Sequence, residues 1–194
     1  MLDKVSDMRR NKAMSYRFMK DRCLSLGAEL LLRDALCDFD IEKTEPLEFE
    51  YRKNEKPYLR GHGDIFFNLS HSGDYVMCAV SGSEVGCDIQ KIDKADIKLA
   101  ERFFTEREYQ AIADLPTEEE RKDMFYRYWT LKESFMKVTG LGMQLALNAF
   151  EILIDDKAAS DVRVSLTQHI DDHTYSFTEF DSVPGYKAAV CTVI

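Results

Sequence analysis

The sequence predicts an α+β fold of two similar halves, about residues 1–82 and 83–194, related by a pseudo-two-fold axis. Two observations lead to this prediction. Each half contains one long helical segment followed by strands. Each half also ends in a Gly-led turn, a Tyr and an apolar strand, at 72–80 and again at 184–190. We expect a ligand to bind in the cleft between the halves.

The elements of the first half are predicted from periodicity and from turn residues. Apolar residues recur with helical spacing over about 12–36, which predicts a helix. Alternation predicts a short strand at 47–51, and apolar runs predict strands at 65–69 and 75–81. A polar stretch with Gly and Pro, 52–63, is expected to be a loop.

The second half opens with a predicted strand at 85–89 and a short helix at 97–104. Thr105 with Glu108 forms a capping box that begins another helix. A second capping box, Thr117 with Glu120, begins a long helix, and Gly140 is a natural residue to end it. Further strands are expected at 150–154, 162–166, 175–180 and 186–193.

Composition indicates a soluble cytoplasmic protein. Hydrophobic residues make up 45% and charged residues 31% of the 194 residues, as is common in globular proteins. No apolar run approaches the ~20 residues of a membrane span, and the first residues do not resemble a secretory signal. The five cysteines lack zinc-type spacing, so we expect reduced thiols, and the four scattered histidines argue against a zinc site.

The charge is unevenly distributed. The net charge of −9 argues against nucleic acid as a partner. Residues 1–33 nevertheless have a net charge of +4, because this segment contains eight basic and four acidic residues. Such a patch suits a small polyanion, although a solvated helix face would look the same.

The long helix places three chemically useful side chains on one face. Trp129, Glu133 and Lys137 are separated by four residues each. An aromatic ring, a carboxylate and an ammonium in one line suit a site that handles a metal ion and a phosphate. The alternative is a solvent-facing Glu–Lys pair beside a partly buried Trp.

A second carboxylate lies upstream in the sequence Val85-Gly86-Cys87-Asp88-Ile89-Gln90. Strand alternation puts Asp88 and Gln90 on one face and Cys87 on the other. An acid among apolar residues needs a partner. We interpret Asp88 as a metal ligand that meets Glu133 across the cleft, and substrate phosphate oxygens and water would complete a magnesium shell. The alternative is an Asp that caps the following turn.

Polar and basic residues of the first half offer phosphate ligands. His71 lies between Ser70 and Ser72, but no G-x-S-x-G elbow is present and adjacent strand residues point to opposite faces, so a hydrolase is disfavoured. An imidazole that contacts a phosphate, or a hydrogen-bonded turn, fits better. Further candidate cations are Lys20, Arg22 and the Lys of Lys56-Pro57.

Five motifs occur in order along nearly the whole chain: KP, FNLSHS, GCDIQ, FFTEREY and WTLKESFMKVTGLG. Together they resemble the 4′-phosphopantetheinyl transferases of the Sfp (surfactin-synthetase-activating) type. The run W-x-x-K-E-x-x-x-K, some 40 residues after G-x-D, is a specific combination. The resemblance implies two α+β halves with coenzyme A bound between them.

The resemblance also implies the reaction. A serine of an apo acyl or peptidyl carrier protein, of the kind used in fatty acid, polyketide or nonribosomal peptide synthesis, attacks the β-phosphate of coenzyme A, and 3′,5′-ADP leaves. Asp88, Glu133 and Lys137 are the expected catalytic residues, and the carrier would dock near 141–154. By the same resemblance, His71, Lys56 and a base near Lys20 or Arg22 approach the 3′-phosphate and adenine end of coenzyme A. The whole coenzyme A site that the resemblance implies comprises Lys20, Arg22, Lys56, Pro57, Ser70, His71, Asp88, Glu133 and Lys137.

Two departures from the family pattern affect these expectations. Many relatives have a third acid where this chain has Gln90, so the expected Mg²⁺ site, which could also take Mn²⁺, comprises Asp88, Gln90 and Glu133. Residues 1–10 also leave little room for a first strand. A non-catalytic module that binds coenzyme A or the carrier is the main alternative, and hydrolysis of a nucleotide diphosphate is a weaker one. Because a chain that already contains both halves could work without a second copy, we expect a monomer.

Overall fold

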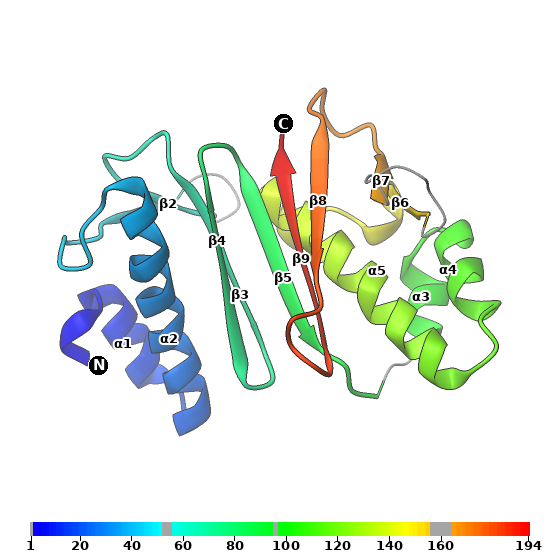
Figure 1. The fold of residues 1–194 in the computed structure, drawn as a ribbon, viewed down its shortest axis with the longest axis horizontal. Coiled ribbons are helices and arrows are strands. Elements are labelled where there is room, and N and C mark those ends of the chain that lie inside the picture. The colour runs from blue at the N-terminus through cyan, green and yellow to red at the C-terminus, as the bar shows by residue number, and fades with distance from the viewer. Residues whose placement is uncertain (1, 52–55, 95–96, 156–163) are drawn as a thin grey trace.

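The computed structural model describes residues 2–51, 56–94, 97–155 and 164–194 (Figure 1). Two long helices, α2 (Met19–Leu36) and α5 (Glu118–Val138), flank a central group of strands (Figure 1). The predicted α+β class is confirmed. In the described part of the chain, no helix has both the length and the apolar character needed to cross a membrane.

The single helix predicted at 12–36 is wrong in its extent. The structure has α1 (Asp7–Ser15) and α2, because Tyr16 and Phe18 adopt extended backbone with ψ of 139° and 141°. Ser6 caps α1 by accepting a hydrogen bond from Arg9 N. Short 3-10 turns, Leu2–Lys4 and Cys37–Phe39, lie at the outer ends of this helix pair.

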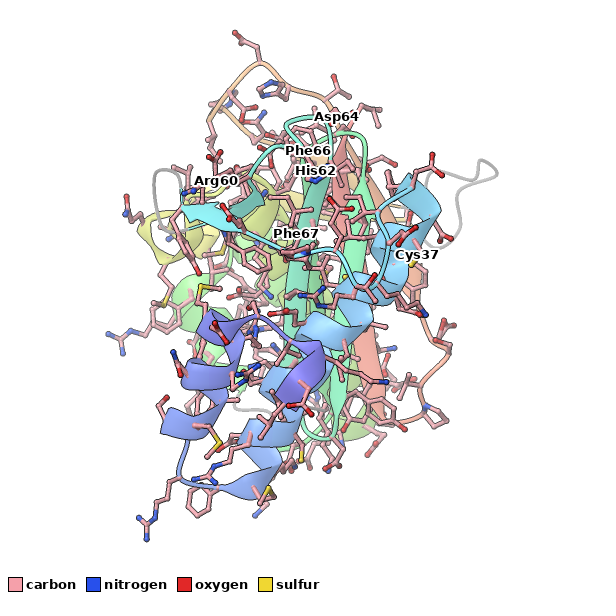
Figure 2. The ribbon with its side chains drawn as sticks, turned by 90° about the vertical axis from the view of Figure 1, so that its left-hand side faces the viewer. Cys37, Arg60, His62, Asp64, Phe66 and Phe67 are labelled. Atoms are coloured by element: carbon pink, nitrogen blue, oxygen red, sulfur yellow. The ribbon has the colours of Figure 1, made fainter. Side chains whose placement is uncertain are left out.

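Two antiparallel hairpins follow the helices. β1 (Phe49–Tyr51) pairs with β2 (Pro57–Leu59), so the predicted loop contains a strand, and its residues 52–55 lie outside the described residues. β3 (Phe66–Ser72) pairs with β4 (Tyr75–Ser81). Figure 2, viewed from the side of α1 and α2, shows these helices covering β3 and β4. The core beneath α2 comprises Leu32, Leu36, Ile41, Leu47, Leu59, Ile65 and Phe67.

The second half is built on a three-stranded antiparallel sheet in the order β5 (Val85–Lys91), β9 (Tyr186–Val193), β8 (Tyr175–Phe180). α5 packs across β5 and β9, and buries Leu131 and Phe135 against Ala189 and Cys191. Both predicted capping boxes are present and begin α4 (Glu106–Ala113) and α5.

Smaller elements complete this half. α3 (Ile97–Phe103) precedes α4, and 3-10 turns at Gly142–Gln144 and Leu147–Ala149 follow α5. β6 (Glu151–Ile154) pairs with β7 (Val164–Thr167). The strand predicted at 162–166 is therefore seen from Val164 onward, and residues 162 and 163 lie outside the described residues.

Side chains of β3 join it to β5. Asn68 Oδ1 accepts from Cys87 N at 3.0 Å, and the hydroxyls of Ser70 and Ser72 accept from Ile89 N at 3.4 Å and from Lys91 N at 3.0 Å. Each bond joins residues 19 apart, so the two strands run in the same direction. The sequence N-x-S-x-S thus replaces a backbone ladder with side-chain acceptors.

The two Gly-led turns predicted from the internal repeat are present. Gly73 and Gly185 have φ of 58° and 77°, in the left-handed region that Gly adopts without strain, and they precede β4 and β9. The rings of Tyr75 and Tyr186, which follow these glycines, contact each other edge to face at 4.9 Å. The pseudo-two-fold axis and the boundary near residue 82 stay predictions.

Candidate active site

A buried acid of β5 is the centre of the candidate site. Asp88 is 2% exposed. Its Oδ1 accepts from Lys137 Nζ at 2.6 Å and from Ser70 Oγ at 2.7 Å, and its Oδ2 accepts from Gln90 Nε2 at 3.0 Å. Asp88 therefore has the partners that its apolar surroundings require, and these partners are side chains rather than a turn that it caps.

Glu133 faces the same region from α5, one helical turn before Lys137. Burial raises the pKa of Glu133, the charge of Asp88 raises it further, and Lys137 opposes both effects. Glu133 therefore stands within electrostatic range of Asp88 and Lys137. No hydrogen bond or ion pair to its carboxylate is found among the described residues. The oxygens of Glu133 are thus free to accept a ligand.

Gly86 determines how closely α5 approaches β5. A Cβ atom on Gly86 would lie 2.1 Å from Ser134 O and 2.4 Å from Val138 N, and no side chain fits in that space. A Gly within a strand often marks such a close backbone approach. The Gly of the G-x-D motif thus brings the helix with Glu133 and Lys137 onto the strand with Asp88.

Ser70 and Gln90 hold Asp88 from two sides. Ser70 is buried, donates to Asp88, and accepts from Lys137 Nζ at 3.1 Å. Gln90 donates to Asp88 through Nε2, and its Oε1 accepts from Ser72 Oγ at 3.2 Å. The amide of Gln90 is therefore beside the site. Its predicted role as a metal ligand stays a prediction.

The donor set fits a divalent cation with few protein ligands. Within the residues that the structure describes, no group of three or more His, Cys, Asp or Glu side chains is placed to hold a metal ion. Asp88 and Glu133 are two carboxylates, which is the number that Mg²⁺ commonly takes from a protein when substrate phosphates and water supply the rest.

The other predicted ligands lie apart from this cluster. His71 is exposed, and it points to the face of β3 opposite Ser70. The ammonium of Lys20 is 2.9 Å from Asp74, and Arg22 Nε donates to Tyr16 O at 2.8 Å. Pro57 begins β2, and Lys56 before it is buried. Within the described part of the chain, no hydrogen bond or ion pair joins any of these five residues to Asp88, Glu133 or Lys137.

Two residues of the W-x-x-K-E motif support the helix rather than the cluster. The ring of Trp129 packs 5.7 Å from that of Phe125, in the core, so Trp129 is not at the site. Lys132 is fully buried, pairs with Glu108 at 2.7 Å, and donates to two backbone carbonyls after α5, at Leu147 and Phe150. The sequence analysis named Lys132 only as part of the motif and did not predict its buried ion pair. A Lys that lies among the apolar residues of a helix is the sequence feature that could have indicated it.

Two open cavities lie elsewhere. One, of about 850 Å³, lies between α5, β8 and β9, and another, of about 940 Å³, is lined by the N-terminal residues and 43–47. Neither is lined by Asp88, Glu133 or Lys137. The expected ligand cleft between the halves therefore stays a prediction.

Two carboxylates and a lysine, built on a strand and a helix of an α+β fold, can bind a phosphate-bearing ligand through a divalent cation. Two family models match the chain. The one described as the 4′-phosphopantetheinyl transferase superfamily matches residues 84–191, and the one described as 4′-phosphopantetheinyl transferase, N-terminal, matches residues 1–83. The chain belongs to the 4′-phosphopantetheinyl transferase superfamily, as its motifs predicted.

Individual relatives are similar over most of their length. The chain is 35% identical to the 4′-phosphopantetheinyl transferase psf-1 of Bacillus pumilus, over 97% of this chain and 78% of the relative. It is 35% identical to the transferase gsp of Aneurinibacillus migulanus (97% and 76%), and 29% identical to Sfp of Bacillus subtilis strain 168 (96% and 81%). A holo-(acyl-carrier-protein) synthase structure from Bacillus anthracis is 21% identical, with a TM-score of 0.48 over 57% of this chain and 95% of that one.

Proposed function

We propose that this enzyme transfers the 4′-phosphopantetheine group of coenzyme A to a serine of an apo acyl or peptidyl carrier protein. Family membership supports the reaction. The observation that supports an active site between β5 and α5 is the proximity of Asp88 on β5 to Glu133 and Lys137 on α5. A bound Mg²⁺ or Mn²⁺ at Asp88 and Glu133 would neutralise charge on the pyrophosphate.

The chain's own residues then have distinct roles. The serine oxygen forms a bond to the β-phosphorus, the bond from that phosphorus to the bridging oxygen breaks, and 3′,5′-ADP leaves. Glu133 accepts the serine proton, directly or through water. Lys137 offsets negative charge on the leaving group. Ser70 and Gln90 orient Asp88 through the hydrogen bonds described above.

The family resemblance supports further contacts. The exposed imidazole of His71 and a base near Lys20 or Arg22 are proposed for the 3′-phosphate and adenine end, and Pro57 is proposed as part of the same coenzyme A site. The carrier is proposed to dock at 141–154, where Met143 is 98% exposed. We also infer a cytoplasmic monomer with no nucleic acid or membrane partner. Five free cysteines agree with a reducing compartment.

A transfer assay tests this function. The protein is incubated with coenzyme A, Mg²⁺ and a panel of apo acyl and peptidyl carriers, and the carriers are weighed by mass spectrometry. We expect a gain of one phosphopantetheine on at least one carrier. Asp88→Ala and Glu133→Ala should abolish it while circular dichroism stays unchanged, and Glu106→Ala, at an exposed position of α4, should be fully active.

The contrary outcomes are distinct. Undiminished transfer by Glu133→Ala would refute the proposed site. Tight binding of coenzyme A without transfer to any carrier would indicate a non-catalytic binding module. Release of 3′,5′-ADP in the absence of carrier would indicate a hydrolase.

A further inference from the structure

Lys56 places its ammonium in a buried position between β5 and the C-terminal end of α5. Its Nζ donates to Glu84 Oε2 at 2.6 Å, to Val85 O at 3.2 Å and to Val138 O at 3.2 Å, and its side chain is 5% exposed. A lysine ammonium has three N–H donors and no acceptor. These three acceptors use all the donors, and an ammonium that is 5% exposed is closed off from a phosphate of coenzyme A. Lys137 Nζ also has three acceptors, Ser70 Oγ, Cys87 O and Asp88 Oδ1, but its side chain is 25% exposed and so remains within reach of a ligand.

The two carbonyls belong to the elements that form the site. Val85 begins β5, three residues before Asp88, and Val138 ends α5, directly after Lys137. The last carbonyls of a helix lack partners within the helix, and a cation at this end is favourable. The ammonium of Lys56 therefore ties the end of α5 to the start of β5. The close contact of Gly86 with Val138 N lies at the same junction.

Glu84 favours the charged form of Lys56 and links the junction between α5 and β5 to the first half of the chain. Its Oε1 accepts from Tyr58 OH at 2.9 Å, while its Oε2 pairs with Lys56. Burial lowers the pKa of Lys56, and Glu84 opposes that effect. Lys56 and Tyr58 both come from the segment of β2, so a strand of the first half supports the helix of the second.

We propose that Lys56 is a positioning residue of the transferase site and not a ligand of coenzyme A. It fixes the C-terminal end of α5 against β5, and so sets where Glu133 and Lys137 stand relative to Asp88. This inference rests on the proposed function, and it departs from the contact with the 3′-phosphate and adenine end that the family resemblance implies for this lysine.

The test compares Lys56→Met with wild type in three measurements. Calorimetry gives the affinities for coenzyme A and for 3′-dephospho-coenzyme A, hydrogen exchange reports on the amides of 134–140, and the transfer assay gives kcat and KM. We expect the preference for coenzyme A to change less than about twofold, since only a lost phosphate contact would reduce it. The amides should exchange faster, and kcat should fall about 10- to 100-fold because the helix end is misplaced.

Matched variants keep the outcome decisive. Lys43→Met removes an exposed lysine that pairs with Asp34, and it should leave all three measurements unchanged. If Lys56→Met does not fold because the carboxylate of Glu84 is left unpaired, Lys56→Met/Glu84→Gln removes that charge as well.

Three results would overturn the inference. A preference for coenzyme A that collapses towards unity, with unchanged exchange, would make Lys56 a phosphate ligand. Faster exchange with unchanged kcat would make it a residue of stability alone. Unchanged exchange together with unchanged kcat would show that Lys56 does not position the end of α5. If wild type transfers nothing, the proposed function fails, while the exchange and affinity measurements still decide whether Lys56 holds the helix or the ligand.

Discussion

Replacing Gly86 by Ala is expected to disable the site by forcing α5 away from β5. The new Cβ would lie 2.1 Å from Ser134 O, and ordinary contact begins at 3.4 Å, so the two backbones must separate by more than 1 Å. Both neighbours are backbone atoms, which have no rotamer to change. Forced overpacking of this kind costs about 1–3 kcal/mol of unfolding free energy. A displacement of about 1 Å at the catalytic groups costs about 100-fold in rate.

Gly82→Ala is the matched control, because a Cβ there meets nothing within 4 Å and the backbone is not left-handed. Urea unfolding and the carrier transfer rate are measured for wild type and both variants. Gly82→Ala should match wild type in both. If Gly86→Ala also matches wild type in both, α5 does not depend on this close approach, and the account of how Glu133 and Lys137 reach Asp88 is wrong.

Three further predictions concern single side chains. Gln90→Glu adds a third carboxylate and should tighten Mg²⁺ binding or leave it unchanged in calorimetry; markedly weaker binding would place residue 90 outside the metal shell. Burial raises the pKa of Glu133 above its ordinary 4.5, so the folded state favours the protonated form, and this contribution to stability is lost as pH rises through the raised pKa. Glu133→Gln should therefore stabilise the metal-free protein at about pH 7 and less so towards about pH 4, and thermal melts that show a constant difference would contradict this. Lys132→Met leaves the carboxylate of Glu108 buried without its partner and should cost about 3–5 kcal/mol in urea unfolding, whereas Lys122→Met, at a surface pair, should cost about 0–1 kcal/mol; equal losses would argue against a special role for the buried pair.

Local signals predicted the second half of the chain well. Thr117 and Glu120 form their capping box within four residues, and Gly140 follows the helix with φ of 68°. Such features depend on neighbours in the sequence, so they can be recognised without the fold. Strand alternation at Asp88 was equally local. It predicted that Asp88 and Gln90 share a face, and in the structure the two side chains are hydrogen-bonded and lie on the same face as Gly86, which α5 contacts.

The first half shows where local reasoning fails. The chain turns between α1 and α2 at Tyr16 to Phe18, where neither Gly nor Pro marks the break. Helical spacing on both sides therefore looked continuous. The extended backbone there lets α1 pack against α2, which is a tertiary effect that periodicity does not report.

The face predicted for α5 was only partly correct. A helix turns by about 100° per residue, so residues eight apart are offset by about 80°. Trp129 accordingly packs on Phe125 in the core, while Lys137 reaches Asp88. The acceptors of Lys56 could not be predicted at all, because they come from the ends of two elements that meet only in the fold.

The hydroxyl of Ser70 has a further consequence. It can donate once and accept twice, and it does so to Asp88, from Lys137 and from Ile89 N. Ile89 N is one of the β5 amides that donate to side chains of β3. The single hydroxyl oxygen of Ser70 therefore both joins β3 to β5 and orients the carboxylate of Asp88. Asp88 is correctly aimed only after those strands have docked. Catalytic activity would thus report that β3 and β5 are joined, and a partly folded chain in which they are apart would be inactive.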